Sequence, residues 1–172
     1  MKKINLSIQI VNFNTKTYLI DCLKSVFCSL SGNKLYFEIN ILYNYSYDYL
    51  SDFSRFFNDS ETESLKIYQS PKNLGFGAGH NYLAKNTKAK HLLLLNPDIV
   101  IKEKERIETL YKRMINDPLV KVIGPKLYNK KGNNQVWDHG ESKGLLAKFL
   151  NELGFGLWRN RRQEIDCAWV SG

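Results

Sequence analysis

The feature that most limits the fold is a regular alternation of short strand-like segments with segments of helical periodicity. Between the first two strand-like segments, apolar residues recur at the three- and four-residue spacing of an amphipathic helix: Leu19, Cys22, Leu23, Val26, Phe27 and Leu30. Alternation at this pace predicts an α/β fold, in which a mostly parallel sheet is flanked by helices and joined by right-handed crossovers. The expected strands are 6–11, 36–43, 65–69, 91–95 and 120–124.

The remaining segments complete this expected order. Further helices are predicted from Leu50 to Phe57, from the glycines of "GAGHNYLAKNTKAK", and between Lys102 and Asn116. The unbroken run "HLLLL" predicts a fourth strand that is buried on both faces. After about Asn129 the pattern loosens, and we expect a loop at "NKKGNNQ", a short helix at "KGLLAKFLNEL" and a strand at "DCAWVSG".

Composition limits the class of protein. The chain has 172 residues, 43% of them hydrophobic, which suits a single domain over residues 1–172. Lys and Arg number 25 against 17 Asp and Glu, so the ligands that fit are phosphate-bearing molecules, anionic membrane surfaces or nucleic acid. The strands are aliphatic rather than aromatic and basic, so no nucleic-acid partner is expected.

The cysteines and the apolar runs indicate the cellular setting. Cys22, Cys28 and Cys167 are odd in number and lack metal-binding spacing, so they are expected to be reduced thiols in a cytoplasmic protein. No run approaches the roughly 18 apolar residues of a membrane span, so any membrane contact is expected to be peripheral.

Four segments follow the first four expected strands and therefore meet at one edge of the sheet. They are Asn12-Phe13-Asn14, the stretch 44–48, the glycine segment 73–81 and Asn96-Pro97-Asp98. In open α/β sheets the ligand crevice lies outside the carboxyl ends of the strands. The sequence therefore predicts a ligand site built from these segments.

The Asn-Pro-Asp segment ends the fourth strand. Pro97 has no amide hydrogen for the sheet ladder, so it stops the strand and directs Asp98 toward the crevice. A carboxylate at this place suits a divalent cation shared with substrate phosphates. The alternative is that Asp98 caps a turn or the next helix.

The glycine segment "NLGFGAGHN" matches no dinucleotide fingerprint. Counting from Gly75, that fingerprint needs glycine where His80 stands, and it belongs after a first strand rather than a third. No Gly-Lys-Ser/Thr closes it as a P-loop. Two interpretations stay open: a glycine turn whose backbone approaches a ligand, and an ordinary turn packed tightly on the sheet.

Three motifs in this order carry a family resemblance: "IQIVNFN" at 8–14, "NLGFGAGHN" at 73–81 and "LLLLNPD" at 92–98, with weaker support from "IGPKLY" and "WVSG". Together they resemble the family 2 glycosyltransferases, especially the rhamnosyltransferase-like branch that builds bacterial surface polysaccharides. The resemblance implies the nucleotide-sugar-binding GT-A fold. It also implies transfer of a sugar from a UDP- or dTDP-sugar donor to a glycan or lipid-linked acceptor, at the inner face of the membrane.

The resemblance also implies site residues. Asp98 would hold a divalent metal, Mg or Mn, as the last carboxylate of the family's metal motif. The segment Val11 to Asn14 would lie against base and ribose, and the glycine segment would lie near the donor. The donor-binding residues implied are Val11, Asn12, Phe13, Asn14, Asn44, Asn73, Gly75, Gly77, His80 and Asn96.

One position departs from the family pattern in the base-binding region. The family's second strand usually ends in an Asp that faces the nucleotide base, and Tyr43 occupies this position in "ILYNYSYD". Asn44, Ser46 and Asp48 match the family. A tyrosine offers no carboxylate, so recognition of the base is expected to differ.

The end of the sequence is the second departure. Relatives continue past "WVSG" into a segment that carries the general base, so that base is expected beyond Gly172. Residues of about 1–128 then form the donor-binding part, and about 129–172 an incomplete acceptor-side part. Asp138, His139 and Glu141 in "WDHGE" are able to accept a proton, and a solvated loop explains them as well.

Three functional hypotheses remain. The first is a glycosyltransferase, and the second is a non-catalytic nucleotide-sugar-binding or partner-binding module derived from the same fold. The third, a nucleotide-dependent oxidoreductase, is disfavoured by His80 at a required glycine position. A strand at the chain end leaves an unpaired edge, from which self-association is expected.

Overall fold

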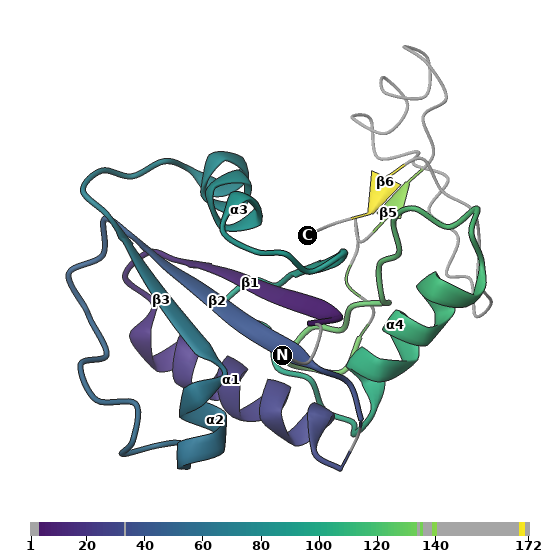
Figure 1. Cartoon of the computed structure of the whole chain (residues 1–172), viewed down its shortest axis with the longest axis horizontal. Helices are drawn as coiled ribbons and strands as arrows, with labels where there is room; N and C mark the ends of the chain where they lie inside the picture. Colours follow the sequence, from purple (N-terminus) through teal and green to yellow (C-terminus); the bar gives the residue numbers. More distant parts are fainter. Residues whose placement is uncertain (1–3, 33, 134, 136–138, 141–168, 171–172) are drawn as a thin grey trace. The chain divides into compact units, whose positions relative to one another are not determined.

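A computed structural model of the chain describes residues 4–32, 34–133, 135, 139–140 and 169–170 (Figure 1). They belong to two compact units, Met1–Asn116 and Asp117–Gly172. The first unit holds the main sheet and all the helices that the structure describes, and the second holds a short antiparallel pair, β5 (His139–Gly140) and β6 (Trp169–Val170). The expectation of a single domain stays a prediction.

The main sheet has four parallel strands in the order β3-β2-β1-β4 (Figure 1). The strands are β1 (Leu6–Asn12), β2 (Phe37–Asn44), β3 (Leu65–Ser70) and β4 (His91–Leu94). The helices are α1 (Lys16–Leu30), α2 (Asp59–Glu63), α3 (Phe76–Lys85) and α4 (Arg106–Asn116). The predicted α/β fold with a parallel sheet is confirmed.

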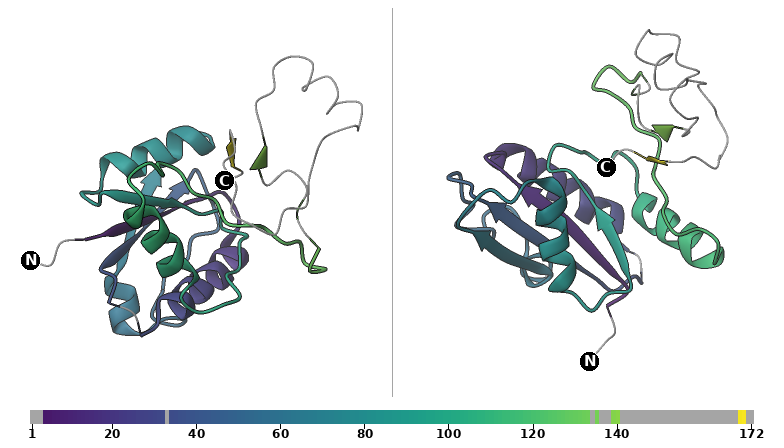
Figure 2. Two further views of the ribbon diagram at one scale, coloured as in Figure 1. Left: turned by 90° about the vertical axis from the view of Figure 1, so that its right-hand side faces the viewer. Right: turned by 90° about the horizontal axis from the view of Figure 1, so that it is seen from above.

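Strand alternation divides the sheet into two faces with different chemistry. Ile8 of β1 pairs with Ile39 of β2, and both pack on the apolar face of α1 around Leu23. The helix α3 covers the opposite face, as two views show (Figures 1 and 2). The hydrophobic core therefore lies on the α1 side of the sheet.

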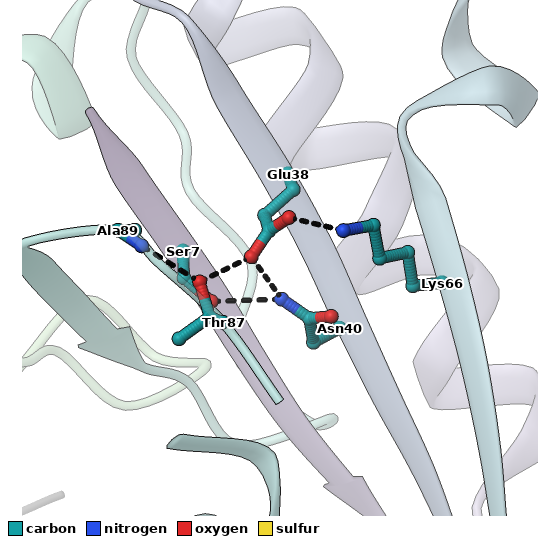
Figure 3. A network of polar contacts seen from close by, with 6 residues as sticks. All are labelled: Ser7, Glu38, Asn40, Lys66, Thr87 and Ala89. Atoms are coloured by element: carbon teal, nitrogen blue, oxygen red, sulfur yellow. Dashed lines mark hydrogen bonds and ion pairs between the residues drawn. The ribbon is translucent and has the colours of Figure 1, made fainter. Parts of the chain in front are cut away.

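The α3 side of the sheet carries a buried polar network near the amino ends of the strands (Figure 3). The Glu38 carboxylate accepts a hydrogen bond from Lys66 Nζ at 2.6 Å, one from Asn40 Nδ2 at 2.9 Å and one from the Thr87 hydroxyl. Asn40 Nδ2 also donates to Ser7 Oγ at 2.8 Å. Because Thr87 follows α3, this network fixes the connection between α3 and β4.

The prediction that the fourth strand is buried on both faces is wrong. Leu92 and Leu94 are 38% and 43% exposed. Leu92 pairs with Ser7 and Leu94 with Gln9, so both leucines lie on the face of the sheet that α3 covers. The helix α3 packs over β1 and β2, whereas β4 lies at the edge of the sheet. An apolar run indicates burial but does not say how far a covering helix extends.

Two predicted elements are absent from the places expected. The stretch 50–57 forms a turn, with the amides of Phe56 and Phe57 donating to the Phe53 carbonyl at 3.0 Å. The helix comes later, as α2, because Asn58 and Glu61 form a reciprocal capping box at its start. Residues 120–124 form no strand, because no described segment pairs with them and β-propensity alone does not make a strand.

The last predicted elements are only partly described. The helix expected between Lys102 and Asn116 begins at Arg106, because Glu105 adopts a left-handed φ of 62° and donates its amide to the Ser29 carbonyl. The described residues of 129–135 form the predicted loop. The predicted helix at 143–153 lies outside the described residues, and only Trp169–Val170 of the last strand is described. In the part of the chain that the structure describes, no helix is long and apolar enough to cross a membrane.

Candidate functional site

The carboxyl ends of β1 and β2 are tied together by the side chain of Ser46. Its hydroxyl donates to the Asn12 carbonyl at 2.8 Å and accepts from Asn12 Nδ2 at 3.3 Å and from the Asn14 amide at 3.2 Å. Asn14 Oδ1 accepts the amide of Tyr47 at 2.9 Å. The structure therefore brings the predicted residues Asn12 and Asn14 against the loop that follows β2.

Asp48, which matches the family pattern, acts on the first helix. Its Oδ2 accepts the amide of Lys16 at 2.6 Å, at the start of α1. A carboxylate at a helix N-terminus satisfies an unpaired amide and interacts favourably with the helix dipole. The role of Asp48 in this structure is to anchor α1 to the loop after β2.

Asn44 and Asn73 fix the glycine segment to the end of β2. Asn44 Nδ2 donates to Asn73 Oδ1 at 2.9 Å, and Asn44 Oδ1 accepts the Leu74 amide at 2.8 Å. Asn73 Oδ1 also accepts the Gly75 amide at 2.8 Å. Both asparagines were predicted as donor-binding residues, and in the structure their side chains hold this loop in place.

The glycines of the segment have different surroundings. Gly75 precedes α3 with a φ of 77°, which favours glycine. A Cβ on Gly79 would lie 3.0 Å from both methyl groups of Val11, so this glycine allows α3 to pack tightly on β1. A Cβ on Gly77 would meet no atom within 4 Å. Tight packing of this segment on the sheet is thus seen at Gly79, which lies inside a helix rather than in a turn, and the ligand interpretation stays a prediction.

His80 is a buried side chain whose ring nitrogens have no hydrogen-bond partner in the described residues. It is 4% exposed and meets the ring of Phe76 edge-on at 4.5 Å between centroids. Burial lowers the pKa of His80, so at neutral pH its imidazole offers one donor and one acceptor. Buried polar atoms without partners are costly, and this marks His80 as a candidate for ligand contact.

The Asn-Pro-Asp segment forms a turn closed by the Ile99 amide donating to the Asn96 carbonyl at 3.2 Å. Asp98 is exposed on this turn, which follows the end of β4 as predicted. The buried thiol of Cys22 donates to the same Asn96 carbonyl, with a sulfur-to-oxygen distance of 3.7 Å. Burial and the nearby charge of Asp98 raise the pKa of Cys22 to about 12. No sequence pattern connects Cys22 with this turn.

Asp98 is the metal ligand that the sequence predicts. No group of three or more His, Cys, Asp or Glu side chains placed to hold a metal occurs among the described residues. A single exposed carboxylate fits a Mg²⁺ or Mn²⁺ ion that takes its other ligands from substrate phosphates and water. It does not fit a cation held by protein side chains alone.

Tyr43, at the position where the family has an Asp, does not face the crevice. It is 1% exposed within the core on the α1 side, and its hydroxyl accepts the Leu50 amide at 3.1 Å. Burial raises the pKa of Tyr43. Its ring also packs against Tyr49, with centroids 5.0 Å apart. Tyr43 therefore holds the loop after β2 against the core on the α1 side of the sheet.

The structure does not test the three residues considered as a substitute general base. Asp138 and Glu141 lie outside the described residues, and His139 belongs to β5, where it pairs with Val170. The general base stays unassigned.

Comparisons with known proteins agree with this geometry. Residues 7–168 match the family model described as Glycosyl transferase family 2. The fold is similar to the crystal structure of S. aureus TarS 1-349, with 18% identity, 65% of this chain and 32% of that chain covered, and a TM-score of 0.51. The same protein in complex with UDP matches with a TM-score of 0.50, 18% identity and the same coverage of 65% and 32%. The chain thus spans less than half the length of either structure, and no curated protein sequence matches it significantly.

Proposed function

This chain belongs to glycosyl transferase family 2, and on that premise we propose that it binds a nucleotide-diphosphate sugar at the carboxyl edge of its parallel sheet and transfers the sugar. The observation that carries this proposal is a pair of hydrogen-bonded links between chain segments at that edge. Ser46 joins the ends of β1 and β2, and Asn44 joins β2 to the loop before α3. Together they hold three chain segments around one place, where open α/β sheets bind their ligands.

The start of α3 suits the diphosphate. Unpaired amides at a helix N-terminus attract anions, and glycines let the backbone approach a phosphate closely. The open space beside Gly77 and the unpartnered imidazole of His80 support this assignment. Val11 to Asn14 would then lie against the base and ribose.

The turn that carries Asp98 suits the reacting end of the donor. Asp98 would hold a divalent cation together with the phosphates of the donor. A bound cation stabilises the negative charge that develops on a departing diphosphate. The chain's own contribution is to keep the Asp98 carboxylate in place, through the turn closed at Asn96 and supported by Cys22.

The finer assignments are part of the proposal. The donor would be a UDP- or dTDP-sugar, which the complex of TarS with UDP supports for the nucleotide. The transferred group would be a hexosyl or rhamnosyl residue, and the acceptor a glycan or lipid-linked glycan of surface polysaccharide synthesis. The reaction would take place at the cytoplasmic face of the membrane.

A second candidate is a non-catalytic module that binds nucleotide sugars. Tyr43 favours it, because a buried tyrosine at the position where the family pattern has an Asp offers the site no carboxylate. Binding without turnover would separate the two candidates.

The test is calorimetric titration of the chain with UDP and dTDP, with and without Mn²⁺. We expect Mn²⁺ to strengthen binding, and Asp98→Ala to remove this effect. Glu63→Ala is the matched control, because Glu63 is an exposed carboxylate on α2, before the amino end of β3. If neither nucleotide binds to a chain that circular dichroism shows to be folded, donor binding is wrong. If nucleotides bind but UDP-sugars and dTDP-sugars are not turned over with glycan acceptors, the second candidate is preferred.

A further inference from the structure

The imidazole of His80 lies at the start of α3. In a helix, side chains lean back toward the N-terminus, over the turn that precedes their own residue. The ring of His80 accordingly meets the ring of Phe76, the first residue of α3, edge-on with centroids 4.5 Å apart. The side chain is 4% exposed, and neither ring nitrogen has a hydrogen-bond partner in the described part of the chain. A buried and unpartnered polar side chain therefore reaches the N-terminal turn of this 10-residue helix.

The same turn attracts anions. The first amides of a helix have no partner within it, and the helix dipole adds positive potential there. Gly75 and Gly77 place no side chain in front of these amides, and a Cβ on either would meet no atom within 4 Å. The glycine segment 73–81 contains no Lys or Arg, so His80 is the side chain in it that can become a cation near neutral pH.

The described surroundings of His80 do not stabilise an imidazolium. The helix α3 packs on β1 and β2, and β1 has no ionisable side chain. Glu38 of β2 is paired with Lys66, and Tyr43 lies on the α1 side of the sheet. The ionisable side chains on α3, β2, β4 and the turn after β4 are Glu38, Tyr43, Tyr82, Lys85, His91 and Asp98. None of them alters the pKa of His80, which burial alone lowers below its ordinary value of 6.5.

We propose that His80 takes up a proton from solvent when the diphosphate of the donor binds at the start of α3, and that its imidazolium then contacts the phosphate oxygens. This inference rests on the proposed function, because it requires a diphosphate at this place. A neutral imidazole has one donor nitrogen, whereas an imidazolium has two donors and a positive charge. The diphosphate supplies the negative charge that favours the protonated ring, so the pKa of His80 is higher in the complex than in the chain without nucleotide.

Nucleotide affinity then depends on pH with a definite sign. Because the pKa of His80 is higher in the complex, the complex holds more protons than its separate components. Affinity therefore rises as the pH falls through the interval between the two pKa values, by at most about tenfold per pH unit for one proton. A phosphate group takes up its own proton near about pH 6, so the range from about pH 8 to about pH 6.5 reports mainly on the protein.

The test is calorimetric titration of the chain with UDP and with dTDP, in Mg²⁺ at about pH 7, in Pipes, Hepes and Tris buffers. The slope of the observed enthalpy against the ionisation enthalpy of the buffer gives the number of protons taken up on binding. The parent is expected to take up about half a proton or more beyond the uptake of His80→Gln. Glutamine keeps a hydrogen-bonding side chain but cannot be protonated. Protons that the nucleotide releases to the buffer when it binds the metal are common to both proteins, so the difference isolates His80.

His91→Gln is the matched control. His91 is a second histidine with a buried ring nitrogen that has no partner in the described residues. It begins β4, pairs with Leu6 at the amino end of the sheet, and packs its ring against Tyr111 with centroids 5.3 Å apart. Proton uptake and nucleotide affinity in this variant are expected to match those of the parent.

Proton NMR of the imidazole resonances gives a second readout in the parent itself. The chain has three histidines, so His80 is assigned by comparison with His91→Gln and His139→Gln. The pKa of His80 is expected to rise when UDP saturates the chain. This measurement decides the matter if His80→Gln binds nucleotide too weakly for calorimetry.

The outcomes distinguish the inference from the function on which it rests. Equal proton uptake by the parent and His80→Gln, or a His80 pKa that nucleotide leaves unchanged, overturns the proton coupling and leaves nucleotide binding intact. Absence of binding by both nucleotides to the folded parent overturns both.

Discussion

Asn44 Nδ2 lies 2.9 Å from Asn73 Oδ1 and donates a hydrogen bond that joins the end of β2 to the loop before α3. The Asn44 side chain is buried, and its oxygen also accepts the Leu74 amide. One side chain thus sets the position of the glycine segment relative to the sheet.

Replacing Asn44 with Ala should release this loop. The substitution leaves the Leu74 amide without its partner, which costs about 1–3 kcal/mol of unfolding free energy. UDP affinity is expected to fall as well, because the glycine segment is no longer held. Urea denaturation and calorimetry measure the two effects. Asn86→Ala is the control, since the exposed Asn86 makes one side-chain bond to the Tyr82 carbonyl; equal losses in both variants would contradict the anchoring role.

Alanine substitutions at two glycines of α3 should have opposite effects on stability. Gly79→Ala places a methyl group 3.0 Å from both methyl groups of Val11, so overpacking should cost about 1–3 kcal/mol. Gly77→Ala meets no atom and should stabilise the helix by up to about 1 kcal/mol. Thermal unfolding measures both.

The Gly77→Ala variant also tests the ligand assignment. If the backbone there approaches the diphosphate, this more stable variant should bind UDP more weakly than the parent. A Gly79→Ala variant as stable as the parent would show that α3 does not pack on Val11 as described.

The Glu38 network should make stability depend on acid pH. Burial opposes ionisation of Glu38, but hydrogen bonds from Lys66, Thr87 and Asn40 outweigh it and hold the pKa below its ordinary value of 4.5. When the pKa of a carboxyl group is lower in the folded state than in the unfolded state, the group stabilises the fold at any pH above its unfolded-state pKa. This stability is lost as the pH falls through its folded-state pKa. Unfolding free energy should therefore decrease below about pH 4.5, and less steeply in Glu38→Gln.

A variant of a surface carboxylate serves as the control. Glu103→Gln removes an exposed carboxylate that pairs with Arg106 on the surface, and its acid dependence should match that of the parent. The role assigned to Glu38 is wrong if all three proteins lose stability in parallel between pH 5 and pH 3.

The two described cysteines should differ widely in reactivity. Cys22 is buried and its pKa is raised to about 12, so it stays a thiol near neutral pH. Cys28 is exposed and lines an open cavity of about 300 Å³ with Lys24 and Lys104. In a Cys167→Ser background, iodoacetamide at pH 8 should label Cys28 and spare Cys22 until the protein unfolds. Rapid labelling of Cys22 in the folded chain, read by peptide mass spectrometry, would contradict its burial.

The parallel sheet and the site edge were predictable because they depend on patterns that local sequence carries. Periodicity separates strands from helices, and Pro97 marks the end of the fourth strand whatever its neighbours are. The features that failed depend on distant partners. Leu92 and Leu94 are exposed because β4 lies at an edge, and 120–124 forms no strand because nothing described pairs with it.

The site shows the same division. Asn44, Asn73 and Asn12 could be singled out from their place after the strands, but their hydrogen-bond partners could not. The support that Cys22 gives to the Asn96 carbonyl joins residues that are 74 positions apart, and no spacing rule connects them. Tyr43 shows the reverse case, because its side chain belongs to the core although its position in the motif suggests the crevice.

The strand order has a consequence for synthesis of the chain. β1 is made first, yet it lies between β2 and β4, and its Leu6 pairs with His91, 85 residues later. At translation rates of about 5–20 residues per second, one side of β1 waits roughly 4–17 seconds for its neighbour. During that interval a nascent chain has an open strand edge beside apolar surface, which is the kind of segment that chaperones bind and that drives misassembly. Slow codons before β4 would lengthen this exposure, whereas those after it would not.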